Sequence, residues 1–143
     1  MATSDQMTGR PDAGAAVTGA RPSLWPAGLV AAAVAAVATT TIAAVARALD
    51  VPLALDGRPI SLAAFPTFTV LGAVAGILLA LAVTRWTGRP RRTFTLLTLG
   101  LTVLSLVPDL LVHVSTGSRL VLMLTHLVAA SIVIPTLRRR LPE

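Results

Sequence analysis

Positions 27–46 read AGLVAAAVAAVATTTIAAVA, twenty residues without one charged side chain. An α-helix needs about 20 mostly apolar residues to cross the hydrocarbon core of a bilayer, which is ~30 Å thick. The run lacks the strict alternation of polar and apolar residues that is typical of a membrane β-barrel strand. It therefore predicts a transmembrane helix that packs closely against its neighbours. Bonds from the three threonine hydroxyls to carbonyls four residues earlier in the same helix are enough to explain those residues.

Three further stretches predict spanning helices in the same way, at 67–84, 93–112 and 120–137, and Asp109 is the one charged residue among them. The composition agrees, since 55% of the 143 residues are hydrophobic and only 13% are charged. Soluble domains carry about 25% charged residues. We therefore expect an all-α protein, with a bundle of four transmembrane helices over residues 25–140, and not a freely soluble enzyme.

Residues 1–24 are small and polar without periodicity, and this composition predicts a disordered tail. The triplet Ala46-Arg47-Ala48 resembles a signal-peptide cleavage site after an apolar stretch. However, the apolar run before it has twenty residues, whereas signal peptides use about 7–15. We expect an uncleaved first helix, with cleavage as the alternative.

Arginine placement predicts the orientation, because cytoplasmic loops of membrane proteins are enriched in Lys and Arg. One side of the predicted bundle has three arginines, Arg47, Arg58 and Arg119, and the other has nine. The nine lie in the N-terminal tail, the second connection and the C-terminal tail: Arg10, Arg21, Arg85, Arg89, Arg91, Arg92, Arg138, Arg139 and Arg140. We expect both termini in the cytoplasm and the chain in the plasma membrane. The five aromatic residues lie at the predicted span borders, as an interfacial belt requires: Trp25, Phe65, Phe68, Trp86 and Phe94.

The first connection contains Asp56-Gly57 between apolar residues, which predicts a tight turn or a small hairpin. Pro59 weakens the second strand of such a hairpin. Ser61 is predicted to cap a helix that continues through Pro66 into the second span. A ligand-binding role for this connection is an alternative to a purely structural one.

The second span contains Gly72 and Gly76, a GxxxG pair on one helical face. Small residues allow the backbone of another helix to approach closely in a bilayer. Packing inside the chain's own bundle is the favoured interpretation, and a homodimer contact is the alternative.

A polar stripe runs along the third span, because its polar residues recur every three or four positions. Leucines occupy the opposite face, so the stripe is expected to face the bundle and the leucines the lipid. The stripe consists of Thr95, Thr98, Thr102, Ser105, Asp109 and, just beyond the span, His113.

Asp109 lies about three residues, or ~5 Å, from the outer end of the third span, which indicates a shallow position. The fourth span runs antiparallel and is expected to bring His126 and Arg119 near Asp109 and His113. One hypothesis is proton or cation handling, because a carboxylate and an imidazole can exchange protons near neutral pH. The other is a structural tie in which Asp109 pairs with Arg119 or His126.

Several classes of function are excluded or disfavoured. The chain has no Cys, two His and six acidic residues, so disulfides and cysteine-bound zinc are ruled out and a dense metal site is not expected. No motif of a hydrolase, nucleotide-binding loop or zinc protease is present. The arginine runs beside apolar spans indicate contact with anionic lipid and not with nucleic acid.

These observations predict no catalytic residues, no metal and no cofactor. The expected function is that of a non-enzymatic integral membrane protein of unknown role, for which an accessory or interaction role is the leading hypothesis. Its expected partners are the bilayer and either a second copy or another membrane protein. The alternative is a small transporter or proton-coupled subunit that uses Asp109, His113 and His126.

Five stretches carry a resemblance to a known family: LWPAGL at 24–29, VARA at 45–48, GRPISL at 57–62, SLVPDLL at 105–111 and LTHLVAASIVIP at 124–135. With them the chain resembles the domain of unknown function 6069 family, four-span membrane proteins of high-GC bacteria, over about residues 24–140. The resemblance implies a four-helix membrane fold and an actinobacterial plasma membrane. It implies no activity.

Overall fold

The computed structural model of the chain describes residues 23–55, 57–111 and 113–143. Within this part, four α-helices follow one another: α1 (Leu24–Ala48), α2 (Ala64–Trp86), α3 (Pro90–Leu111) and α4 (Thr116–Arg138). Each is long and apolar enough to cross a membrane. The all-helical architecture with four potential spans is thus confirmed, and each helix extends two to four residues beyond its predicted span at most ends. Most of the predicted N-terminal tail lies outside the described residues.

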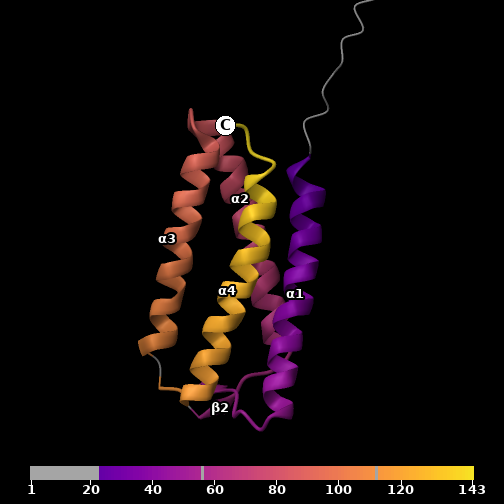
Figure 1. Cartoon of the computed structure of the whole chain (residues 1–143), viewed down its shortest axis with the longest axis vertical. Helices are drawn as coiled ribbons and strands as arrows, with labels where there is room; N and C mark the ends of the chain where they lie inside the picture. Colours follow the sequence, from indigo (N-terminus) through magenta and orange to yellow (C-terminus); the bar gives the residue numbers. More distant parts are fainter. Residues whose placement is uncertain (1–22, 56, 112) are drawn as a thin grey trace, which may run out of the picture.

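The helices form an elongated bundle in which α1 packs against α2 and α4, while α3 lies on the far side from α1 (Figure 1). The start of α1 and the last residues of the chain lie at one end, which we call the terminal end. The short strands β1 (Ala54–Leu55) and β2 (Arg58–Pro59) lie at the opposite end, which we call the hairpin end.

Among the described glycines, Gly28 of α1 has the closest contact with another helix. A Cβ atom added at Gly28 of α1 would stand 2.5 Å from Ile77 Cδ1 and 3.4 Å from Leu137 Cδ2. Ile77 and Ala35 are fully buried beside it. Small side chains along α1 thus let its backbone approach α2 and α4, where close contact replaces the hydrophobic force that is missing in a bilayer.

One threonine of α1 does more than the sequence predicts. Thr40 and Thr41 donate to the carbonyls of Ala36 and Val37, at 2.7 and 2.8 Å, as expected. Thr39 is buried, however, and its hydroxyl lies 2.9 Å from the Thr69 hydroxyl of α2 in addition to donating to Ala36. The bond between α1 and α2 could not be inferred from α1 alone.

The connection between α1 and α2 forms the predicted hairpin. Ala54 pairs with Pro59 and Leu55 with Arg58 in an antiparallel arrangement. Gly57 has φ +78°, a conformation that glycine adopts without strain. The other residue of the predicted turn, Asp56, lies outside the described residues.

Two side-chain bonds fasten this connection to the helices. Arg47 of α1 donates to the Ile60 carbonyl, and Ser118 of α4 donates to the Pro52 carbonyl. The predicted cap at Ser61 is wrong, because α2 begins at Ala64 with Ala63 in the cap position. The Ser61 hydroxyl instead accepts from the Ala63 N–H at 3.2 Å, within the turn before the helix.

Candidate functional site

Helix α3 is joined to the bundle core mainly at the terminal end, where Phe94 is fully buried. Farther along the same face, α3 presents Thr98, Thr102 and Ser105, and these short side chains do not fill the space in front of α2 and α4. The residues opposite are also small, Gly72 and Gly76 on α2 and a pair of alanines on α4. Small residues on three helices therefore leave a cavity between them.

The cavity has a volume of about 840 Å³ and is partly open. Small-molecule sites in proteins typically measure about 300–1,000 Å³ and are mainly apolar with a few polar groups. This cavity fits that description, since aromatic and aliphatic side chains make up most of its wall. Leu55 and Ile60 of the hairpin segment line it together with Phe65, Phe68 and Leu122.

The hydroxyl groups of the polar stripe have their hydrogen bonds within α3. Thr98 donates to the Phe94 carbonyl at 2.7 Å, Thr102 to Thr98 at 2.8 Å and Ser105 to Thr102 at 2.7 Å. These three residues and Asp109 line the cavity. Thr95, the remaining helical member of the predicted stripe, donates to the Arg91 carbonyl and lies in a hollow among arginines at the terminal end. The hydroxyl groups of the stripe therefore need no hydrogen bond from a ligand, and Asp109 is the member of the stripe that could bind one.

Asp109 is buried, with 9% of its surface exposed, and its partner is His126 of α4. His126 Nδ1 lies 3.2 Å from Asp109 Oδ2 and 3.0 Å from the Leu122 carbonyl oxygen. Because a carbonyl oxygen only accepts, Nδ1 carries a hydrogen and donates it to Leu122. The contact with Asp109 lies within ion-pair distance without the geometry of a hydrogen bond, so Oδ2 is a buried oxygen with no hydrogen-bond partner among the described residues.

The depth of this pair differs from the sequence estimate. Asp109 lies two residues before the end of α3, whereas His126 lies ten residues after the start of α4, a distance of about 15 Å along the helix. Since the two side chains are in contact, α3 must end well inside the span of α4, and Figure 1 shows α3 ending short of α4 at the hairpin end. Counting from the end of its own helix therefore underestimated the depth of Asp109.

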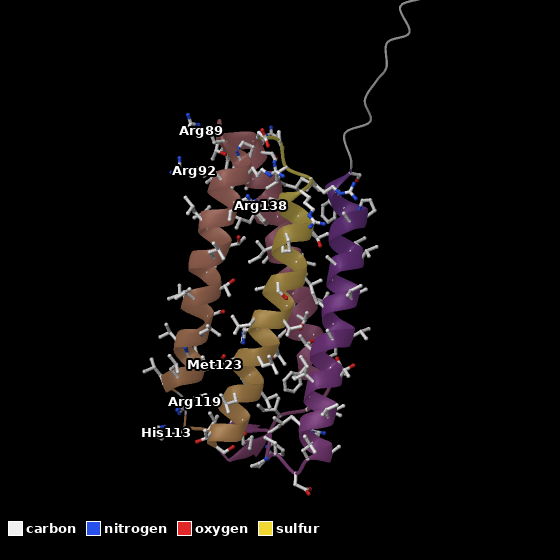
Figure 2. The ribbon with its side chains drawn as sticks, in the orientation of Figure 1. Arg89, Arg92, His113, Arg119, Met123 and Arg138 are labelled. Atoms are coloured by element: carbon white, nitrogen blue, oxygen red, sulfur yellow. The ribbon has the colours of Figure 1, made fainter. Side chains whose placement is uncertain are left out.

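The other two members of the predicted cluster lie elsewhere. His113 follows the end of α3 and is exposed, so helical spacing does not place it on the Asp109 face. Arg119 lies in the first turn of α4. Figure 2 shows both near the hairpin end of the bundle, and neither lines the cavity. Of the four candidate residues, the structure brings Asp109 and His126 together at the cavity.

The GxxxG pair has two different surroundings. A Cβ atom at Gly76 would stand 3.5 Å from Leu137 Cδ1 and 3.7 Å from Val133 Cγ1, which is ordinary packing against α4. A Cβ atom at Gly72 would have no neighbour within 4 Å. Gly76 thus packs inside the bundle, as favoured from the sequence, while Gly72 forms part of the cavity wall.

Sequence reasoning missed the part that Phe65 and Phe68 play, because their position suggested only an interfacial belt. Both line the cavity, and Phe65 is largely buried. Their signal was present, since a spacing of three or four residues links them to Gly72 along one face of α2.

A model of a family of unknown function, DUF6069, matches residues 19–143. The chain belongs to this family. The predicted resemblance is therefore confirmed, and it covers all four helices. Neither the curated proteins nor the solved structures contain a match. Among the described residues, no group of three or more His, Asp or Glu side chains is placed to hold a metal ion.

Proposed function

We propose that this DUF6069 protein is a non-enzymatic protein of the plasma membrane that holds a small, mainly apolar molecule between α2, α3 and α4. The cavity of about 840 Å³ carries the proposal. Its wall is built from small residues of three helices, at positions where larger aliphatic side chains would close the space. Such a wall is expected of a site that receives a molecule, since protein interiors are otherwise packed without large voids.

The proposal places both termini in the cytoplasm. In the described part of the chain, three arginines belong to the hairpin end, Arg47, Arg58 and Arg119. Seven belong to the terminal end, where Figure 2 labels Arg89, Arg92 and Arg138. This asymmetry supports a cytoplasmic terminal end.

A photoreactive probe tests the proposal. The purified protein in lipid nanodiscs is irradiated with a neutral aryl diazirine at increasing concentration, and the adducts are counted by mass spectrometry. Gly72→Leu places a large side chain in the cavity. Gly100→Leu is the control, because Gly100 of α3 does not line the cavity and a Cβ atom there would have no neighbour within 4 Å. We expect a saturable component of labelling that Gly72→Leu removes and Gly100→Leu keeps. Labelling that rises linearly and equally in all three proteins would contradict the proposal.

A proton-coupled transporter is the second candidate, and the contact between Asp109 and His126 favours it. Because the chain has no cysteine, Ser105→Cys introduces a single thiol in the cavity wall. Val103→Cys provides a matched control on the exposed face of the same helix. Transport requires water in the cavity, so a water-soluble thiol reagent should modify Ser105→Cys and leave Val103→Cys unmodified. Protection of both thiols would favour a binding protein without a water pathway.

In the alternative, accessory role, a second copy of the chain or another membrane protein covers the same face in place of a small molecule. A Gly72→Cys variant tests the second copy, because two such residues in contact would form a disulfide under mild oxidation. We expect the protein to remain a monomer in nanodiscs under these conditions. An efficient disulfide-linked dimer would place a second copy over the cavity and replace the ligand proposal.

A further inference from the structure

The proposed site contains one buried carboxylate oxygen without a hydrogen-bond partner among the described residues, Asp109 Oδ2, in an otherwise mainly apolar wall, and this arrangement specifies a class of ligand. We propose that the cavity takes an organic cation with an apolar body, whose positively charged nitrogen lies at Asp109 and whose body extends between α2, α3 and α4. This inference rests on the proposed function and adds to it the chemistry of the ligand.

Asp109 supplies the negative charge. It is the one acidic residue within the four helices, and it is buried against the cavity. Buried polar atoms in proteins are nearly always hydrogen-bonded, and the exceptions mark strain or a group that meets a ligand. Asp109 Oδ2 is such an exception among the described residues. A cation with an N–H group at this point would give Oδ2 the hydrogen bond that no described residue provides.

His126 orients the site without completing it. Its Nδ1 hydrogen is donated to the Leu122 carbonyl, so this hydrogen is not available to Asp109. In this proposal the ligand therefore supplies the hydrogen bond to Oδ2 that His126 does not make.

Aromatic rings form part of the same cavity wall. Phe65 and Phe68 of α2 line the cavity together with Asp109. Ammonium groups bind favourably over aromatic faces, by about 0.5–2 kcal/mol per ring in proteins. The cavity therefore offers ring faces as well as a carboxylate to a cationic ligand.

The rest of the cavity suits an apolar body that enters from the lipid. The hydroxyls of Thr98, Thr102 and Ser105 are bonded within α3, which leaves an effectively apolar wall. Phe68 of α2 and Leu101 of α3 line the cavity and are also exposed, at 72% and 54%. Exposed apolar residues of spanning helices face lipid, so the opening between α2 and α3 faces the bilayer. An amphipathic cation collects in the outer part of a bilayer with its charge toward the headgroups.

A pair of isosteric competitors tests this class of ligand. 4-Phenylbutyl-dimethylammonium, which has one N–H to donate to Asp109 Oδ2, is compared with the neutral hydrocarbon in which carbon replaces the nitrogen, each as a competitor of saturable labelling by the neutral diazirine. Partition of each compound into protein-free nanodiscs is measured separately, and concentrations are expressed in the lipid phase. We expect the cation to compete at least about tenfold better than the hydrocarbon.

Asp109→Asn should abolish this preference while saturable labelling by the neutral probe persists. Asp50→Asn is the matched control, because it removes an exposed carboxylate at the hairpin end and Asn tolerates the positive φ found there. It should keep the preference, as should Asp109→Glu. Because the comparison of the two competitors on the native protein needs no variant, a poorly folded Asp109→Asn would not weaken the test.

Equal competition by cation and hydrocarbon in the native protein would overturn the inference and leave the proposed function standing. If Asp50→Asn lost as much of the preference for the cation as Asp109→Asn does, the inference would also be overturned, since the preference would then come from general surface charge. Absence of saturable labelling with any probe would overturn the proposed function itself.

Discussion

At the scale of single residues, the chain shows that a sequence motif and a close contact need not coincide. Gly72 and Gly76 form the recognisable GxxxG pair, yet a Cβ atom would meet another helix most closely at Gly28, an isolated glycine in an alanine-rich run. Alanine-rich sequence predicts close packing of α1 but not the position of the contact. That position depends on where Ile77 of α2 and Leu137 of α4 lie in the folded bundle, and the local sequence around Gly28 does not contain this information.

This difference predicts opposite effects of one substitution at two glycines. Gly28→Ala would put a Cβ atom 2.5 Å from Ile77 Cδ1, and overpacking of this kind costs about 1–3 kcal/mol of unfolding free energy. Gly72→Ala meets no neighbour and should leave the unfolding free energy unchanged or raise it by up to about 1 kcal/mol, because alanine favours the helix. Unfolding in mixed detergent micelles, followed by circular dichroism, measures both values. Equal values for the two variants would contradict the packing described for α1.

At the scale of secondary-structure elements, α3 is the helix that supplies the polar side of the cavity and its acidic residue. Its apolar length and its hydroxyl stripe were predictable from residue spacing, and so was the proximity of Asp109 to α4. The depth of Asp109 was not, because it depends on how far α3 extends relative to α4. The stripe was expected to face the bundle, and Thr98, Thr102 and Ser105 do face it, where they line the cavity.

The one-sided attachment of α3 gives a second prediction. Phe94 is fully buried, whereas Leu104 on the same helix is 62% exposed and faces lipid. Phe94→Ala should lower the unfolding free energy by about 3 kcal/mol, in the range found for buried phenylalanine. Leu104→Ala should have little effect, since lipid surrounds this position before and after unfolding of the bundle. Unfolding curves in mixed micelles distinguish the two, and a larger loss for Leu104→Ala would mean that α3 packs on its leucine face.

At the scale of the whole molecule, the number of helices and their order follow from hydropathy alone. The hairpin also follows, from Asp56-Gly57. The cavity does not, because it results from small residues on α2, α3 and α4 that meet only in the folded bundle. Phe65 and Phe68 were assigned only to the membrane border for the same reason, because the cavity that they line forms only when the helices pack together.

The proposed orientation predicts the sidedness of two single thiols. Leu49→Cys lies at the exposed end of α1 near the hairpin, and Gly88→Cys lies between α2 and α3, where a side chain has no neighbour within 4 Å. A membrane-impermeant maleimide should label Leu49→Cys in intact cells and Gly88→Cys only after permeabilisation. The reverse pattern would mean that the hairpin end, and not the terminal end, faces the cytoplasm.

The central claim is that the space between α2, α3 and α4 receives a molecule, and a map of diazirine adducts on the native protein tests it most directly. Peptide mass spectrometry after irradiation in nanodiscs would locate each adduct along the chain. The account predicts that saturable adducts concentrate on cavity-lining positions such as Gly72, Leu101 and Ala129. Adducts spread evenly over exposed positions such as Val37 and Val103, with no saturation at the cavity, would contradict it.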